Sequence, residues 1–332
     1  MTNFLKTSDF SREELEDFIA SALKFKSGQN TEKSLSGRSV ALVFFNPSLR
    51  TRTSMQVGIY ELGGNAVFLE PGGTSWTLEH RENVVMDENK TEHLKEFVQV
   101  LERYVSAIGV RTFANLEDWQ LERTDPVLSA FEKYSSKPVI NLESAMHHPC
   151  QSMADMMTIR EKFGSEKKKV LMMWAWHPKP LPMAVPNSFA LAAAQFGHDL
   201  RIARPEGFEL DGELMDEIRK QTAANGGSLE VTTDVNEAFE DAEVVYAKSW
   251  GSFHHYGNAE KAIAERAKYR DDWIVDEAKM RKTNNAVFMH CLPVRRNVVV
   301  SDAVIDSKNS IVIDEAENRL HIQKAIMAKI IG

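Results

Sequence analysis

The sequence predicts an α/β protein of two domains, each with a mainly parallel sheet flanked by helices. Short apolar segments of strand length alternate with segments of helical periodicity, which is typical of parallel strands joined by crossover helices. The first apolar segment, residues 39–45, is apolar throughout, as in strands covered on both faces. The length of 332 residues suits two domains of ordinary size better than one compact core.

Local signals predict the elements in order along the chain. Ser11 and Glu14 form a capping box ahead of apolar residues at helical spacing, which predicts a first helix. Asn46 and Pro47 end the strand at residues 39–45, and helical character resumes over residues 50–63. We expect further strands at residues 66–69, 107–110, 139–141, 169–173, 199–203, 244–247, 286–290 and 311–313. We expect further helices at residues 92–103, 126–134, 152–163, 187–196, 210–225, 236–240 and 318–331.

The break in this pattern near residues 148–151 predicts the domain boundaries. We expect a first domain at residues 1–147, a second at 148–316, and a C-terminal helix at 317–332 that packs back on the first domain. Ligands of open α/β sheets bind at the carboxyl ends of the strands. The polar motifs of this chain directly follow predicted strands, so we expect the binding sites at those edges.

The composition indicates a soluble cytoplasmic enzyme. Hydrophobic residues make up 43% and charged residues 27%, which is an ordinary globular balance. A formal net charge of -8 argues against a nucleic-acid partner. Two cysteines are too few for a disulfide scaffold, and no signal pattern or membrane-length apolar window occurs. We therefore expect a reducing compartment and neither a nucleic-acid nor a membrane partner.

Residues 48–54 read Ser-Leu-Arg-Thr-Arg-Thr-Ser and come between a buried strand and a helix. The first turn of a helix presents unpaired backbone N–H groups and the positive end of the helix dipole. Arg50 and Arg52 add charge-assisted donors there, although arginines in a first turn oppose the dipole. A phosphate or carboxylate site explains them better than a solvated helix start.

Two further motifs are weak when each is taken alone. His148-Pro149-Cys150-Gln151 follows a predicted strand, and its histidine could polarise a carbonyl or remain a satisfied loop histidine. His290-Cys291-Leu292-Pro293 ends another strand, where backbone carbonyls could accept hydrogen bonds from an amide. Arg295 and Arg296 follow, with either a phosphate-binding or a structural role.

In this order the three motifs resemble those of the aspartate/ornithine carbamoyltransferases, over essentially the whole chain. The resemblance is to the ornithine branch, because aspartate enzymes usually lack the cysteine of the third motif. It implies a carbamoyl-phosphate domain first, an amino-acid domain second, and a homotrimer whose active sites lie between subunits. It also implies that no metal or cofactor takes part.

The resemblance further implies the residues of the site. Carbamoyl phosphate would be bound by Ser48, Leu49, Arg50, Thr51, Trp76, Arg111, His148, Pro149, Cys150, Gln151, Cys291, Leu292 and Arg319. The catalytic residues among them would be Arg50, Thr51, Arg111, His148 and Gln151. Donors aimed at the carbonyl oxygen would stabilise the negative charge that develops when an amine attacks it. In the family the main chain of Cys291 acts, so its thiol is not expected to be a nucleophile.

Trp76 lies in a Gly-rich loop, residues 72–76. A lone tryptophan is usually tucked under its own loop, but tryptophan is also enriched at interfaces. In the subfamily that this sequence most resembles, a tryptophan of this loop reaches a neighbouring subunit's site. We therefore expect Trp76 to complete a neighbour's site.

Lys248 identifies the amine substrate. Ordinary ornithine enzymes carry an aspartate here, in Tyr-x-Asp-x-Trp followed by Ser-Met-Gly, and it pairs with the α-ammonium of ornithine. Residues 246–250 read Tyr-Ala-Lys-Ser-Trp, and Ser-Met-Gly is missing. A lysine would repel an α-ammonium but tolerate an acylated nitrogen. The chain thus resembles the N-acetylornithine and N-succinylornithine carbamoyltransferases of arginine biosynthesis, which would form N-acylcitrulline and phosphate.

The acylornithine would contact Glu143, His177, Lys248, Leu292 and Thr91. Thr91 replaces a glutamate of the acetyl enzymes and a proline of the succinyl enzymes, and Val299 replaces a lysine of the characterised acetyl type. Without that glutamate, a succinyl carboxylate could pair with Lys248, which slightly favours N-succinylornithine. Much of the remaining sequence, including residues 314–328, is closer to the acetyl type.

Residues 177–186 contain several prolines, which stiffen a loop by fixing φ. The acylornithine branch has a rigid loop here through which later chain passes, so the resemblance implies a knotted second domain; a stiff lid is the alternative. Three functional alternatives remain open. They are carbamoylation of free ornithine, carbamoylation of aspartate, and a catalytically silent paralogue that serves as a scaffold.

Overall fold

Two parallel sheets organise the chain, which a computed structural model describes over residues 2–332. The residues divide into two compact units. The second unit comprises Asn115–Trp119 and Gln151–Glu317, and the first comprises the remaining described residues, including Asn318–Gly332. No helix within residues 2–332 is both long enough and apolar enough to cross a membrane.

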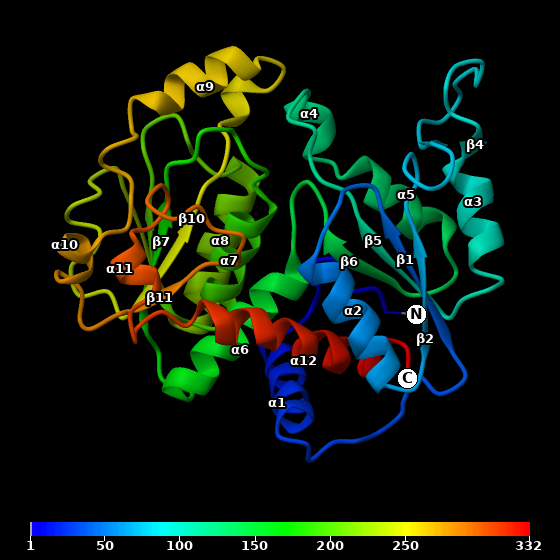
Figure 1. Ribbon diagram of the computed structural model, residues 1–332, viewed down its shortest axis with the longest axis horizontal. Coiled ribbons are helices and arrows are strands. Elements are labelled where there is room, and N and C mark those ends of the chain that lie inside the picture. The colour runs from blue at the N-terminus through cyan, green and yellow to red at the C-terminus, as the bar shows by residue number, and fades with distance from the viewer. Residues whose placement is uncertain (1) are drawn as a thin grey trace. The chain divides into compact units, whose positions relative to one another are not determined.

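The first unit is built on a four-stranded parallel sheet in the order β2-β1-β5-β6 (Figure 1). Its strands are β1 (Ser39–Phe44), β2 (Asn65–Leu69), β5 (Ala107–Arg111) and β6 (Val139–Glu143). Its helical elements are η1 (Thr7–Asp9), α1 (Arg12–Lys26), α2 (Arg50–Glu61), α3 (Leu94–Leu101), α4 (Trp119–Glu122), which starts in the second unit, and α5 (Pro126–Tyr134). A separate two-stranded parallel pair joins β3 (Leu78–Glu79) to β4 (Glu92–His93).

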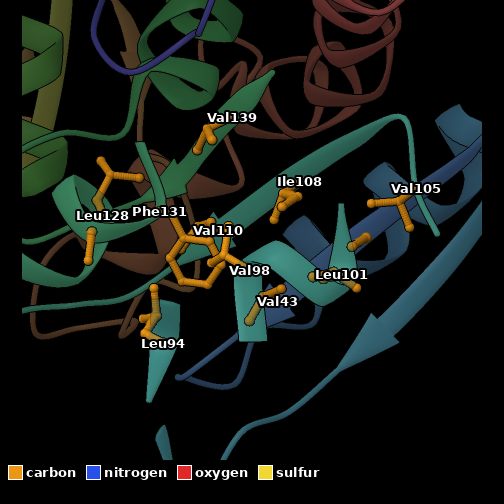
Figure 2. Packing of buried hydrophobic residues seen from close by; sticks show 12 residues of the cluster. Val43, Leu94, Val98, Leu101, Val105, Ile108, Val110, Leu128, Phe131 and Val139 are labelled. Carbon is orange, nitrogen blue, oxygen red and sulfur yellow. The ribbon is translucent and has the colours of Figure 1, made fainter. Parts of the chain in front are cut away.

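The core of the first unit lies between its sheet and helices α3 and α5. Val98 and Phe131 are fully buried against Val43 and Val110 of the sheet, and Figure 2 shows these side chains gathered around the ring of Phe131. Burial of side chains of this kind stabilises a fold by about 1.5–3 kcal/mol each. This packing fixes the strand ends that carry the polar motifs.

The second unit is built on a five-stranded sheet in the order β11-β10-β7-β8-β9, again with parallel pairing. Its strands are β7 (Lys169–Trp174), β8 (Asp199–Ala203), β9 (Ser228–Thr232), β10 (Val244–Lys248) and β11 (Val287–Met289). Its helical elements are α7 (Ala184–Gln195), α8 (Gly212–Asn225), η2 (Phe253–His255), α9 (Ala259–Ala267), α10 (Glu277–Met280) and α11 (Asp302–Ile305). Every residue of α7 is buried, which agrees with its mainly apolar sequence, and Asn187, Ser188 and Gln195 are its buried polar residues.

Two helices contain residues of both units, α6 (Pro149–Phe163) and α12 (Val312–Ile330). The part of α12 that belongs to the first unit packs on α2, where Lys324 bonds Glu61 at 2.5 Å. A Cβ at Gly58 would come within 3.2 Å of the Met327 methyl carbon, so the absence of a side chain permits this close approach. Lys329 pairs with Asp17 of α1 at 3.8 Å.

The prediction of an α/β fold with parallel sheets and flanking helices is confirmed, whereas some elements differ. The strand predicted at residues 311–313 is wrong, because α12 begins at Val312 and only an isolated bridge joins Ser310 to Phe288. Strand β9 was not predicted, since most of its residues are exposed or half-buried and lack an apolar run. Residues 236–240 form turns instead of the predicted helix. The knot stays a prediction.

Candidate active site

The first polar motif forms the start of α2, directly after β1. Thr51 N donates to Ser48 Oγ at 3.2 Å, and no acidic side chain lies in the first turn. Leu49, the residue before the helix, is 78% exposed. The positive end of this helix therefore lacks an internal carboxylate, as an anion-binding turn requires.

Arg52 of that turn is engaged by two neighbouring side chains. The Arg52 guanidinium lies 3.5 Å from the centroid of the Phe68 ring and 3.7 Å from a Glu70 carboxylate oxygen. Arg52 thus fastens α2 to the end of β2. The phosphate role of Arg50 stays a prediction.

Arg319 of α12 joins the first motif across a sequence distance of 268 residues. Its Nη2 donates to Thr51 Oγ1 at 2.5 Å, and both side chains are buried. The charge of Arg319 also acts on Cys150, yet burial dominates and raises the pKa of the Cys150 thiol to about 12. Cys150 is therefore a protonated packing residue, while Thr51 and Arg319 form one donor cluster.

Arg111, Glu143 and His148 form a second cluster in the first unit. Arg111 Nη1 donates to Glu143 Oε2 at 2.5 Å, and His148 Nε2 lies 3.5 Å from the same oxygen. Arg111 ends β5 and Glu143 ends β6, and the two residues pair across a register shift. Glu143 has φ of 144°, a conformation that costs a non-glycine residue energy and is held by the surrounding fold. Glu143, assigned from sequence to the acylornithine, thus touches residues assigned to carbamoyl phosphate.

Gln151 and the His290-Cys291-Leu292 segment meet at two buried carboxylates of the second unit. Gln151 Nε2 donates to Asp155 Oδ1 at 2.8 Å and to Glu315 Oε1 at 3.3 Å. The other oxygen of Glu315 accepts from His290 N at 2.9 Å. Sequence reasoning missed Asp155 and Glu315; the only signal was the helical i,i+4 spacing of Gln151 and Asp155.

Leu292 has φ of 51° and donates its N–H to His290 Nδ1 at 2.8 Å. A leucine in the left-handed region is uncommon and costs energy, so the fold imposes this turn. The turn and the Glu315 contact fix the direction of the main chain around Cys291. This agrees with a main-chain role for Cys291, whose side chain is buried.

Lys248 and His177 belong to loops that leave neighbouring strands of the second unit. Lys248 ends β10 and pairs in register with Trp174, which ends β7. His177 Nε2 accepts from Arg295 Nε at 3.0 Å, and its Nδ1 lies 2.9 Å from Lys179 O. Because the Arg295 Nε–H can only donate, Nε2 must accept, which indicates a neutral imidazole with its proton on Nδ1; Lys179 N also lies 3.1 Å from Nδ1. Burial lowers the pKa of His177, and the nearby positive charges of Arg295, Arg266 and Lys248 act in the same direction.

We call Lys248, Arg295 and the neutral His177 that accepts from Arg295 the cationic cluster, after the positive charges of its lysine and arginine. Across the described chain, Lys248 makes no ion pair with a carboxylate, although it is half-buried. A half-buried ammonium without an anion favours a negatively charged ligand. The sequence allows Arg295 either a phosphate-binding or a structural role, and the structure gives it His177 as a partner.

Trp76 and Thr91 come together in the loop that β3 and β4 hold. Trp76 is 56% exposed, and its Nε1 donates to Glu92 Oε2 at 2.7 Å. Thr91 N donates to Thr77 O at 3.3 Å. The tryptophan is therefore not tucked under its own loop, and Thr91 bonds the residue after Trp76 and precedes Glu92, which the indole bonds.

No group of three or more His, Cys, Asp or Glu side chains in residues 2–332 is placed to hold a metal ion. The donors of the two clusters in the first unit are arginine, threonine and histidine side chains at strand ends and at helix starts. Such donors suit a phosphate and a polarised carbonyl. The cationic cluster suits a carboxylate or another anion.

Family models match most of the chain. The carbamoyl-P binding domain of aspartate/ornithine carbamoyltransferases matches residues 2–161, and their Asp/Orn binding domain matches residues 182–330. The N-acetylornithine carbamoyltransferase of Xanthomonas campestris pv. campestris is 48% identical, over 100% of this chain and 98% of its own length. The N-succinylornithine carbamoyltransferase of Bacteroides thetaiotaomicron is 42% identical, over 85% of this chain and 84% of its own.

Solved structures agree with the family models. A crystal structure of acetylornithine transcarbamylase complexed with acetylcitrulline has a TM-score of 0.97 and 48% identity, covering all of both chains. A single-site variant of N-acetyl-L-ornithine transcarbamylase, complexed with carbamyl phosphate and N-succinyl-L-norvaline, has a TM-score of 0.96, covering 99% of this chain and 100% of that one. The chain therefore belongs to the aspartate/ornithine carbamoyltransferase family, in the branch of the N-acylornithine enzymes.

Proposed function

We propose that this carbamoyltransferase moves the carbamoyl group of carbamoyl phosphate to the side-chain amine of an N2-acylated L-ornithine, forming N-acylcitrulline and phosphate. The observation that carries the proposal is Lys248, an ammonium without an ion-pair partner among the described residues. Its position would repel the α-ammonium of free ornithine but tolerates a neutral, acylated nitrogen. The α-carboxylate of the substrate supplies the anion that the cationic cluster lacks.

The first unit carries the donors for carbamoyl phosphate. The start of α2, with Ser48, Arg50 and Thr51, would bind the phosphate through N–H groups and charge. Arg111 and His148 would donate to the carbonyl oxygen, while Glu143 fixes both of them. Arg319 would add a donor through its bond to Thr51.

The reaction follows from this division of roles. The neutral amine attacks the carbonyl carbon, a C–N bond forms, and the C–O bond to phosphate breaks. The carbonyl oxygen gains negative charge as the amine attacks, and donors aimed at it lower the barrier. Phosphate departs with the electron pair, which Arg50 stabilises, and the amine proton is lost to phosphate or water.

The acyl group is the finer part of the proposal. The relatives do not favour the succinyl preference that Thr91 suggested, because the acetyl enzymes match over more of the chain and at higher identity. The physical argument also weakens, since the α-carboxylate of either substrate can pair with Lys248 and Arg295. We therefore propose N-acetylornithine as the substrate. N-succinylornithine is the alternative, because Thr91 carries no carboxylate that would repel its succinyl group.

We also propose a homotrimer that acts in arginine biosynthesis in the cytoplasm. The exposed Trp76 supports a shared site, because its indole is available to a second subunit. We propose that residues 1–147 form the carbamoyl-phosphate domain and residues 148–316 the acylornithine domain. In this proposal the helix at 317–332 belongs structurally to the first of them.

The deciding experiment supplies purified protein with carbamoyl phosphate and, in parallel, ornithine, N-acetylornithine, N-succinylornithine or aspartate. We expect turnover of an acylornithine and none of aspartate. Turnover of free ornithine alone would contradict the role of Lys248, and silence with all four amines would favour a scaffold.

A matched variant tests Lys248 itself. Lys248→Asp restores the charge that ornithine enzymes carry at this position. We expect Lys248→Asp to lower kcat/KM for the acylornithine by about tenfold or more. We also expect the ratio of kcat/KM for free ornithine to that for the acylornithine to rise. Lys248→Arg, which keeps the charge, serves as the control. An unchanged substrate ratio in Lys248→Asp would remove this residue from the site.

A further inference from the structure

Arg266 is a buried arginine that neither the motifs nor the proposed chemistry account for. It lies in the last turn of α9, and its side chain is 1% exposed. Burial lowers the pKa of its guanidinium to about 10. A buried charge without a carboxylate is costly, so a fold retains it where its hydrogen bonds have a purpose. Its contacts show which residues it holds.

The guanidinium bonds to two loops of the second unit. Nε donates to His177 O at 2.6 Å, and Nη2 donates to Ser249 Oγ at 2.7 Å. His177 follows β7, and Ser249 is the residue after Lys248 at the end of β10. The carbonyl of Arg266 itself accepts from Trp176 Nε1 at 2.9 Å. Arg266 is thus tied to the two loops that carry His177 and Lys248.

The aromatic surroundings keep this geometry rigid. The guanidinium lies 5.3 Å from the centroid of the Trp174 ring and 5.9 Å from that of Phe208. The planar fork of arginine can donate in two fixed directions while it stacks on such rings, which lysine cannot do. Three further bonds join the two segments: Ala175 N donates to Lys248 O at 3.0 Å, Trp174 Nε1 to Trp250 O at 2.9 Å, and Gly251 N to Leu181 O at 2.8 Å. Arg266 adds to them a link from the Ser249 side chain to the main chain of His177.

We infer that Arg266 is a positioning residue that holds His177 and Lys248 at a fixed separation for the acylornithine. We call its bonds to His177 O and Ser249 Oγ the Arg266 clamp. The inference rests on the proposed function, in which His177 and Lys248 bind the substrate. Small displacements of positioned groups cost activity steeply, so loosening the clamp weakens acylornithine use. Carbamoyl phosphate, assigned to other residues, is left unaffected.

Arg270 offers a matched control. It is an exposed arginine just after α9, and its guanidinium lies 5.4 Å from the centroid of the Trp176 ring. Arg270→Gln therefore removes an exposed arginine that contacts Trp176, next to His177, but that bonds neither His177 nor Ser249. Ser249→Ala removes only one bond of the clamp, and it tests the inference in a variant that keeps the buried arginine.

The kinetic experiment compares wild type, Arg266→Lys, Ser249→Ala and Arg270→Gln. We expect Arg266→Lys to raise KM for N-acetylornithine about tenfold and Ser249→Ala to raise it about threefold, with KM for carbamoyl phosphate within about twofold. Since the two changes break one clamp, their effects in the double variant should fall short of additive. Equal rises in both KM values, or no rise in folded Ser249→Ala, would overturn the inference.

A second measurement does not depend on the substrate. We expect amide hydrogen exchange to accelerate in residues 175–183 and 248–254 of Arg266→Lys, and in neither segment of Arg270→Gln. Unchanged exchange in both segments refutes the clamp even if the enzyme turns over N-acetylornithine. A different outcome is faster exchange in Arg266→Lys together with a wild-type protein that turns over no acylornithine. That outcome would refute the proposed function and leave the clamp as a structural device.

Discussion

Arg50 and Arg52 lie two residues apart in the first turn of α2, and the neighbours of Arg52 give it a structural role. Arg52 is engaged by Phe68 and Glu70 at the end of β2, so its charge is already balanced. The turn itself contains no acidic side chain. A phosphate at this helix start would thus rely on the N–H groups and on Arg50.

The pair allows a direct comparison of two arginines. We expect Arg50→Ala to raise KM for carbamoyl phosphate and to lower kcat about a hundredfold, because a charge-assisted contact to the departing phosphate is lost. Arg52→Ala should mainly lower stability, by about 0.5–1 kcal/mol, through loss of its contact with Phe68. Steady-state kinetics and urea unfolding of both variants test this. Equal kinetic defects would contradict the separation.

Asp125 is a second residue whose surroundings set its behaviour. It adopts φ of 48° and accepts from Ser144 Oγ and Ala145 N, both at 2.7 Å. It also accepts from Met146 N at 3.2 Å. These residues lead into His148, so Asp125 shapes the loop before the second motif. Burial nevertheless raises the pKa of Asp125 from 3.8 to about 6.

The raised pKa predicts a pH dependence of stability. Between about pH 4 and pH 6 the folded protein holds a proton on Asp125 that the unfolded chain has released. The contribution of Asp125 to the free energy of unfolding therefore falls as the pH rises through this window. Asp125→Asn should flatten that slope, since asparagine tolerates this backbone conformation and cannot ionise. Urea titrations at several pH values measure it, with exposed Asp271→Asn as the control. An unchanged slope in Asp125→Asn would refute the assignment.

At the scale of elements, the segment that contains β3 and β4 is held by one buried carboxylate. Glu79 accepts from the backbone N–H groups of His80 and Arg81, each at 2.9 Å, and pairs with Lys90 at 3.1 Å. The Arg81 guanidinium is the main cause that lowers the pKa of Glu79 well below its usual range. Thr91 therefore lies between two residues that are held in place. Lys90 before it pairs with Glu79, and Glu92 after it accepts a hydrogen bond from the Trp76 indole.

This fixed position makes Thr91→Glu an informative change. The new carboxylate would come to a defined place beside Trp76 and would repel a succinyl carboxylate more than a neutral acetyl group. We expect the ratio of kcat/KM for N-acetylornithine to that for N-succinylornithine to rise about tenfold. Thr74→Glu, on the Gly-rich loop, is the control. A ratio that does not move in Thr91→Glu would mean that Thr91 does not line the acyl site.

The elements also show what the sequence could and could not predict. Neighbouring residues alone predict a buried strand such as β1 and the capping box of α1. The structure contains both. Strand β9 and the early start of α12 depend on neighbours in space, so local patterns missed them. The contact of Glu143 with Arg111 arises from a register shift, and the Arg266 clamp joins residues 89 and 17 positions apart. No local pattern encodes such contacts.

For the whole molecule, the remaining question is whether subunits share sites. Leu49 and Tyr60 of the α2 region are each 78% exposed, and Trp76 is also exposed. Large apolar side chains at such exposure are typical of surfaces that bind a partner when they gather in one patch. In the proposed homotrimer that partner is a second copy of the chain. The proposal predicts that Trp76 of one subunit acts with Arg50 of another.

Mixing two inactive variants tests this sharing. In Trp76→Ala subunits Arg50 is intact, and in Arg50→Ala subunits Trp76 is intact. If each site takes Arg50 from one subunit and Trp76 from its neighbour, random trimers from an equal mixture contain both intact residues in about a quarter of their sites. Reversible dissociation of the mixture lets the subunits exchange, and tagged subunits verify the exchange. We therefore expect the mixture to regain about a quarter of wild-type activity. Each parent alone should stay near its own low activity. Exchange that yields only the mean of the two parents would show that Trp76 serves its own subunit or none, and the shared site would have to be abandoned.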